Sequence, residues 1–231
     1  MEMYGFFDTS FGYDRQRQIL SGTDCIFGAK EKVSVLVPQG SGKTTLLKLL
    51  RRRLRPRKGQ VKAPPGISWP VGTASAFHPA LTGEENIRHI AMLLGGNAVE
   101  VSNWIEAFTK LGSRYSERLS EYSSGERARL SYALSYAIPR EFYLSEDDIA
   151  TGDQSFRDAC AGVMNARLKD AGLFLVTRNP KTAAKYCERY FVLENTKFVE
   201  HMSSDDAAEH FNDFLTSIDS DKITLDFNEV G

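Results

Sequence analysis

A glycine-rich stretch that ends in lysine and threonine is the first feature of this sequence that could do chemistry. It spans residues 37–45 and reads VPQGSGKTT. Glycine lets a loop turn its backbone N–H groups toward phosphate oxygens, and Lys43 would reach the outer phosphates while the Thr44 hydroxyl ligates Mg²⁺. The sequence therefore predicts a nucleotide-phosphate cradle made of Gly40, Ser41, Gly42, Lys43, Thr44 and Thr45.

This loop lies between a strand-like run and a helix-like run. Residues 33–37 before it are mostly β-branched or apolar, and leucines follow it at helical spacing: Leu46, Leu47, Leu49, Leu50 and Leu54. A strand, a loop and a helix in this order are the context that a phosphate loop requires, because the helix N-terminus adds partial positive charge. Val37 departs from the pattern, since it replaces the first glycine. The alternative is an ordinary strand-to-helix turn with an incidental lysine.

The bulk composition bounds the class of protein. The chain has 231 residues and 42% hydrophobic content, enough for one α/β domain spanning residues 1–231. Lys and Arg total 29 against 30 for Asp and Glu, so the net charge gives no sign of nucleic-acid binding. The three cysteines are widely spaced and favour a reducing compartment, and no apolar run approaches the ~18 residues expected of a membrane span.

The remaining pattern predicts an α/β fold with two additions to a mostly parallel sheet. The first ~30 residues suggest a small antiparallel sheet, and residues 77–137 suggest an inserted helical lobe. Buried strands are expected at 142–144, 172–177 and 190–193, followed by a C-terminal helix and polar tail over about 203–231. The basic run at residues 51–58 is expected in the last turn of the helix after the loop, with a lipid-headgroup or polyanion contact as the alternative.

A second group of polar residues follows the helical lobe. Ser123, Ser124 and Gly125 open a helix, where a hydroxyl and exposed N–H groups form an anion site. The strand at 142–144 then leads into three consecutive carboxylates at residues 146–148. An ordinary helix cap is the alternative for the serine and glycine.

This order of parts resembles the nucleotide-binding subunit of ABC transporters, over about residues 1–200. Within that family the sequence is similar to exporters of capsular polysaccharide and lipopolysaccharide O-antigen. The stretches that carry this likeness are ISWP at 67–70, FHPALTGEENIR at 77–88, YSSGERARL at 122–130 and ATGD at 150–153. The resemblance implies a P-loop NTPase core that binds ATP with Mg²⁺.

The resemblance also implies partners and a location. In the family, two subunits enclose two ATP molecules, so that Ser123 and Gly125 of one subunit face the γ-phosphate held by the other. A membrane-spanning permease is the second partner, which would place the chain at the cytoplasmic face of the inner membrane. Glu126 stands where the family often has Gln or Met, and we expect its carboxylate to point away from phosphate.

Other family roles fall on residues with equally plausible structural explanations. An N-terminal aromatic stacks on adenine in the family, and Phe11 and Tyr13 are the candidates, with core packing as the alternative. His78 lies where the family usually has a glutamine that senses Mg²⁺ and contacts the membrane partner. An exposed loop histidine is the alternative there.

The catalytic positions depart from the family pattern. Counting back from Gly152 and Asp153 places the Mg²⁺-linked carboxylate at Glu146 and the catalytic carboxylate at Asp147, the reverse of the usual order. A one-residue shift to Asp147 and Asp148 would put Glu146 inside an apolar strand. Arg178 stands at the place of the switch histidine, where it can hold a phosphate but cannot readily accept a proton.

Two functions remain open, with a third as a weaker alternative. The first is an ATP-driven motor subunit of a polysaccharide exporter that hydrolyses ATP slowly through Asp147, Glu146 and Arg178. The second is a regulatory or structural half that binds ATP and depends on a competent partner, and the third is a P-loop kinase or GTPase. The sequence names neither the exported glycan nor whether the two subunits are identical, and the short tail favours the capsule type.

Overall fold

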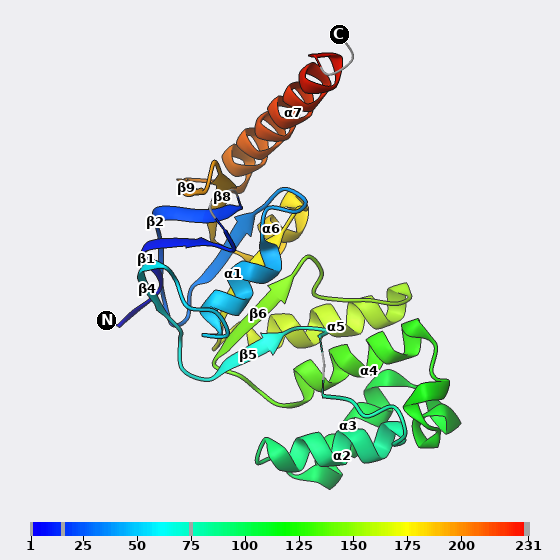
Figure 1. Cartoon of the computed structure of the whole chain (residues 1–231). Helices are drawn as coiled ribbons and strands as arrows, with labels where there is room; N and C mark the ends of the chain where they lie inside the picture. Colours follow the sequence, from blue (N-terminus) through cyan, green and yellow to red (C-terminus); the bar gives the residue numbers. More distant parts are fainter. Residues whose placement is uncertain (1, 15–16, 74–75, 229–231) are drawn as a thin grey trace. The chain divides into compact units, whose positions relative to one another are not determined.

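A computed structural model describes residues 2–14, 17–73 and 76–228 (Figure 1). The chain forms two compact units. The first contains Met1–Pro64 and Gly172–Gly231, and the second contains Pro65–Ala171. The predicted single domain over residues 1–231, with a lobe at about 77–137, stays a prediction.

The first unit contains both kinds of predicted sheet. Its antiparallel sheet has the order β2-β1-β4, formed by Gln18–Gly28, Met3–Gly12 and Lys58–Lys62. Its mixed sheet has the order β7-β3-β8-β9, formed by Gly172–Thr177, Lys32–Leu36, Arg189–Glu194 and Lys197–His201. β3 pairs in parallel with β7 and β8, whereas β9 runs antiparallel to β8. The central strands are continuous apolar runs because the sheet buries both of their faces.

The described residues of this unit form three helices: α1 (Lys43–Leu50), α6 (Pro180–Tyr186) and α7 (Ser204–Asn228). α7 packs Ala207 and Phe211 against Leu36 and Val192 of the sheet, then continues outward as a long rod (Figure 1). The helix takes in most of the stretch predicted as helix and polar tail, and residues 229–231 lie outside the described residues. The placement of the basic run was wrong, because α1 ends at Leu50 and residues 51–57 form the turn that leads into β4.

The second unit contains the helical lobe and two strands. β5 (Ile67–Pro70) pairs in parallel with β6 (Phe142–Glu146). The helices are α2 (Gly83–Leu93), α3 (Ala98–Thr109), α4 (Ser124–Ala137) and α5 (Gln154–Arg167), with 3₁₀ turns at Gly112–Ser116 and Leu119–Glu121. Ile87, Ile105, Tyr115, Leu130 and Leu134 are among the buried side chains that join α2, α3 and α4. The predicted α/β fold, with a mostly parallel sheet, an antiparallel sheet and an inserted helical lobe, is confirmed.

The cysteines contribute to packing rather than to a cluster. Cys25, Cys160 and Cys187 are all buried and unpaired with one another. Burial raises the pKa of the Cys160 thiol to about 11, so this thiol stays protonated at neutral pH. Among the described residues, no helix combines the length and the apolar character needed to cross a membrane.

Candidate nucleotide site

The phosphate loop connects β3 to α1 and leaves the start of the helix open. Gly42 occupies the N-cap position with φ 103°, and no side chain caps the helix there. A Cβ on Gly42 would lie 2.7 Å from Cγ2 of Ile19, whereas a Cβ on Gly40, at φ 79°, would meet no atom within 4 Å. The first N–H groups of a helix have no intrahelical acceptor, so the loop exposes donors beside a positive helix end. This geometry suits a phosphate.

The buried face of α1 anchors the loop. Leu46, Leu47, Leu49 and Leu50 are fully buried, and the Val37 N–H donates to the Thr177 carbonyl of β7 at 3.0 Å. In the first turn of α1, Lys43 is half-buried and Thr44 is exposed. The loop therefore starts from a rigid sheet and ends on a rigid helix, which is what holds a binding group in a fixed position.

The two candidate adenine-stacking residues lie in different environments. Phe11 is 6% exposed and packs edge-on against Tyr13, which is 49% exposed. The Tyr13 hydroxyl and the Thr45 hydroxyl are 3.1 Å apart, and the Arg17 guanidinium lies 5.7 Å from the Tyr13 ring centre. The exposed ring of Tyr13 is thus tied to the helix that follows the phosphate loop, while Phe11 serves the core.

Arg178 also lies beside the phosphate loop. It follows β7, and its Nη1 donates to Oε1 of Gln39 at 2.9 Å, across 139 residues of sequence. Both side chains are exposed. A guanidinium, a group that binds phosphate well, is therefore tethered to the phosphate loop.

The carboxylates Glu146 and Asp147 lie on a tight turn at the end of β6. Glu146 is the last residue of the strand, and the Asp148 N–H donates to its carbonyl at 2.8 Å. Asp147, at the centre of this three-residue turn, has φ 60°. Such a turn is rare and strained for a residue other than glycine, and strained residues often mark functional sites. Tyr132 holds the turn by donating its hydroxyl to the Asp148 carbonyl at 3.1 Å.

Ser123 opens α4 through a capping box with Glu126. The Glu126 N–H donates to the Ser123 hydroxyl at 3.2 Å, and the Ser123 N–H donates to Oε2 of Glu126 at 2.7 Å. The expectation that the Glu126 carboxylate points away from this helix start was wrong. A carboxylate at the third helical position satisfies the orphan N–H groups and the helix dipole, so the helix draws it inward. Gly125 lies beside it in open space, since an added Cβ would meet no atom within 4 Å.

His78 is an exposed residue on a loop that a buried amide holds in place. Asn86, only 2% exposed, accepts from the His78 N–H at 2.7 Å and donates to the carbonyls of His78 and Thr82 at 3.0 and 2.8 Å. The Ala80 N–H donates to Nδ1 of His78 at 3.3 Å, so a neutral imidazole carries its proton on Nε2. The His78 side chain is exposed on this loop.

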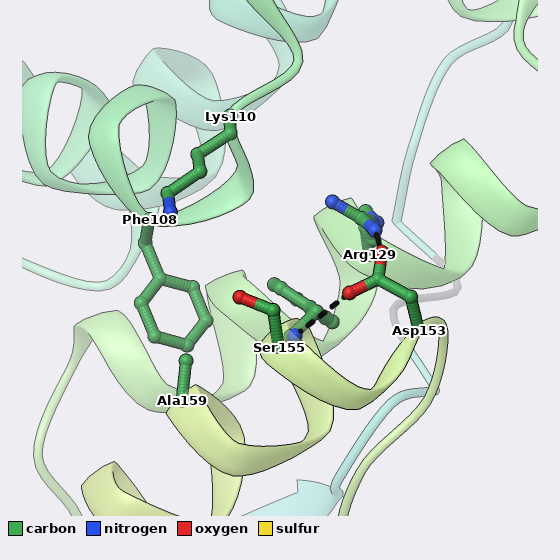
Figure 2. Close-up of a pocket in the computed structure, with 7 residues that line it drawn as sticks. Phe108, Lys110, Arg129, Asp153, Ser155 and Ala159 are labelled. Atoms are coloured by element: carbon green, nitrogen blue, oxygen red, sulfur yellow. Dashed lines mark hydrogen bonds and ion pairs between the residues drawn. The ribbon is translucent and has the colours of Figure 1, made fainter.

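A pocket of about 200 Å³ lies elsewhere in the second unit, between the end of α3 and the start of α5. Figure 2 shows Phe108 and Lys110 on one side of it, Arg129 and Asp153 on the other, and Ser155 between them. Arg129 forms an ion pair with Asp153, which caps α5 by accepting from the Phe156 N–H at 3.1 Å. None of the predicted site residues lines this pocket.

Three residues next to the predicted site were missed in the sequence. Gln39 stands inside the phosphate loop, but nothing in the sequence around it indicates that Arg178 will contact it. Asn86 was detectable as a polar residue adjacent to the apolar face of α2. Arg114 gave no local signal, yet its guanidinium contacts Glu126 at the start of α4.

Comparison with known proteins identifies the family. The ABC transporter profile matches residues 20–147. The chain is 35% identical over 182 residues to the capsule polysaccharide export ATP-binding protein CtrD of Neisseria meningitidis serogroup B, covering 79% of this chain and 84% of the relative. It is 29% identical over 208 residues to the O-antigen export system ATP-binding protein RfbB of Klebsiella pneumoniae, covering 85% of each.

The fold agrees with this assignment. A solved structure of an ATP-binding subunit of an ABC transporter superposes with a TM-score of 0.75 at 21% identity, covering 91% of this chain and 94% of that one. Since a match at this identity speaks for the fold alone, the family rests on the profile and the relatives. The chain belongs to the ABC transporter family.

Proposed function

We propose that this chain is the ATP-binding subunit of an exporter that moves a capsular-type polysaccharide through a membrane-spanning permease. The observation that carries the proposal is the uncapped start of α1 at Gly42, where the backbone donors of the phosphate loop meet Lys43 and Thr44. Within the described residues, the first turn of this helix contains no Asp or Glu. Anions bind favourably at such helix ends.

As a member of its family, the chain binds ATP with Mg²⁺. The residues present fit these groups, because a Cβ built on Gly40 meets no atom within 4 Å, which leaves the backbone there open to a phosphate, and Lys43 supplies a cation. Thr44 and Glu146 would hold Mg²⁺, which supplies charge neutralisation when bound. Tyr13 is the better candidate for stacking on adenine, since its ring is exposed and Phe11 is buried.

The relatives support the substrate class and the partners. Their names describe export of capsule polysaccharide and of O-antigen, and the capsule relative is the more similar of the two. The proposed assembly contains two nucleotide-binding subunits and a permease, at the cytoplasmic face of the inner membrane. His78 lies on an exposed loop and is the candidate contact to the permease.

Slow hydrolysis of ATP is the proposed activity. Asp147 polarises the attacking water, and Arg178, tethered to Gln39, holds the γ-phosphate. Arginine stays protonated and does not accept a proton, so the step that a histidine would assist is left to Asp147. The altered positions favour one alternative, a regulatory subunit that binds ATP and relies on a competent partner for turnover.

The experiment measures affinity for Mg-ATP and turnover in the chain assembled with its permease. Stimulated turnover that disappears in Asp147→Asn supports the motor subunit. If the wild-type chain binds ATP tightly but does not hydrolyse it, the regulatory alternative is supported. If Lys43→Ala binds ATP as tightly as wild type, the nucleotide site itself is wrongly assigned.

A further inference from the structure

The start of α4 binds an anion that belongs to the chain itself. Oε2 of Glu126 accepts from the Ser123 N–H at 2.7 Å and from the Ser123 hydroxyl at 2.8 Å. Under the proposed function, Ser123 is the residue that faces the γ-phosphate of ATP held by the second subunit. The donors that Ser123 would offer to that phosphate are therefore already engaged by a carboxylate.

This carboxylate is ionised at neutral pH. Hydrogen bonding to Arg114, followed by hydrogen bonding to Ser123, lowers the pKa of Glu126 to about 2. A like charge a few ångströms from a bound phosphate weakens binding by roughly 10-fold or more where water screens it only in part. A negative charge at the predicted phosphate site needs a compensating cation.

Arg114 is placed to supply that cation. Its Nε donates to Oε1 of Glu126 at 3.1 Å, and its Nη2 lies 3.4 Å from Oε2 of the same carboxylate. The guanidinium is itself held by an ion pair with Glu117 and by a hydrogen bond to the Glu121 carbonyl at 2.6 Å. It also lies 5.8 Å from the centre of the Tyr122 ring. These contacts fix the cation against the same carboxylate that Ser123 binds.

We propose that Arg114 is a positioning residue for phosphate recognition at the start of α4. The Glu126 carboxylate is shared between Ser123 and Arg114. When the γ-phosphate of the facing subunit's ATP arrives, Ser123 transfers its hydrogen bonds to the phosphate, and the carboxylate keeps its fork-like contact with Arg114. This inference rests on the proposed function, because it assumes that Ser123 meets ATP across a pair of subunits.

The test compares ATP affinity in two preparations, the chain assembled with its permease and the dilute isolated chain, by titration with a fluorescent ATP analogue and Mg²⁺. Arg114→Met should weaken binding in the assembly by about 10-fold, and leave the isolated chain unchanged. Adding Glu126→Gln to Arg114→Met should restore affinity to within about 3-fold of wild type, because the uncompensated charge is gone. The defect of Arg114→Met should also shrink as salt rises.

Arg127→Met is the matched control. Arg127 follows Glu126 in the first turn of α4 and donates to the carbonyls of Tyr122 and Ser120 at 3.1 and 3.4 Å, contacts that involve no carboxylate. It removes the same charge from the region, so an equal defect in both variants would overturn a specific role for Arg114. If Arg114→Met and the double variant lose ATP affinity equally, the role of Arg114 is structural and the proposal is overturned. Arg114→Lys keeps the positive charge but loses the two-nitrogen contact with the carboxylate. If Arg114→Met does not fold, Arg114→Lys replaces it in the test and should show an intermediate loss of ATP affinity.

The failure of this inference is distinguishable from failure of the proposed function. Lys43→Ala in the same assembly tests the phosphate loop of the first unit directly. If ATP binding survives Lys43→Ala, the nucleotide site is wrong. If Lys43→Ala abolishes binding while Arg114→Met binds as wild type, or if wild type binds ATP equally in both preparations, only the role of Arg114 is overturned.

Discussion

Two helix starts in this protein are predicted to meet phosphate, and they are built in opposite ways. α1 begins at Gly42 with no side-chain cap and no acidic residue in its first turn. α4 begins at Ser123 with a complete capping box and the Glu126 carboxylate in its first turn. The open start has no side-chain cap, so an incoming phosphate has no cap to displace there. The closed start is already bound by the Glu126 carboxylate, which must give up its contacts with Ser123 before a phosphate can bind. We infer that the start of α1 binds the nucleotide, whereas the start of α4 changes its hydrogen bonds when the nucleotide of the facing subunit arrives.

The largest expected effect is at the open start. Lys43→Ala should weaken Mg-ATP binding by about 100-fold in the isolated chain, because a charge-assisted contact to phosphate is worth up to about 3 kcal/mol. Titration calorimetry with Mg-ATP checks this. Ser123→Ala in the same isolated chain serves as the control, since its role requires a facing subunit. Equal losses in both variants would contradict the separation of the two helix starts.

The next largest effect is a difference in stability between alanine substitutions at Gly42 and at Gly125. Gly42→Ala should lower the free energy of unfolding by about 1–3 kcal/mol, because alanine is strained at positive φ. The added methyl would also press on Ile19, at 2.7 Å from its Cγ2. Gly125→Ala, whose Cβ meets no atom within 4 Å, should leave stability unchanged or slightly higher. Denaturation in urea measures both, and a destabilised Gly125→Ala would show that α4 needs its glycine for folding.

A smaller effect is expected from the cap itself. Ser123→Ala should lower the free energy of unfolding by about 1 kcal/mol, since the Glu126 N–H loses its acceptor. Urea denaturation of wild type and Ser123→Ala measures the change, and Ser124→Ala is the neighbouring control, because Ser123, not Ser124, provides the cap. Indistinguishable denaturation midpoints for wild type and Ser123→Ala would mean that the capping box contributes nothing.

The smallest effect is a pH dependence, which Glu126 should impose. Its pKa is lowered from 4.5 to about 2 in the folded protein, first by Arg114 and then by Ser123. Between these values the unfolded chain binds a proton that the folded chain does not, so the contribution of Glu126 is complete above pH 4.5 and declines as the pH falls toward 2.

Denaturation of wild type and Glu126→Gln at pH 6 and at pH 3 measures this contribution. The advantage of wild type should shrink at pH 3, and it should amount to less than about 1 kcal/mol because the pair faces solvent. Glutamine retains the capping geometry, so a difference that stays constant with pH would show that the charge of Glu126 has no part in it.

Much of the fold was predictable because its signals are local. β3, the phosphate loop and α1 follow one another within residues 32–50, and the apolar runs of β6, β7 and β8 lie where they were expected. The start of α4 was also predictable from Ser123 and its neighbours. The position of the basic run was not, because α1 ends one residue before it and the chain turns into β4. Helix ends depend on packing and caps more than on composition.

The carboxylate at Glu126 shows why one expectation about the site was wrong. Repulsion from a phosphate argued that this side chain should point away, and that argument neglected the helix end and Arg114, both of which attract it. Arg114 lies in a 3₁₀ turn 12 residues before Glu126, and no pattern in the sequence joins the two residues. The attraction of the carboxylate to the helix end and to Arg114 acts as soon as the helix forms, whereas repulsion from a phosphate acts only when the ligand is bound.

By itself, the sequence determined that this protein has a strand, a glycine loop and a helix suited to nucleotide phosphate, since each depends on residues adjacent in the chain. Only the tertiary structure decided which side chains surround the two helix starts. Arg178 reaches Gln39 across 139 residues, and Tyr13 reaches Thr45 across 32. Such pairings depend on how sheets and loops bring distant segments together, and residue types alone do not specify them.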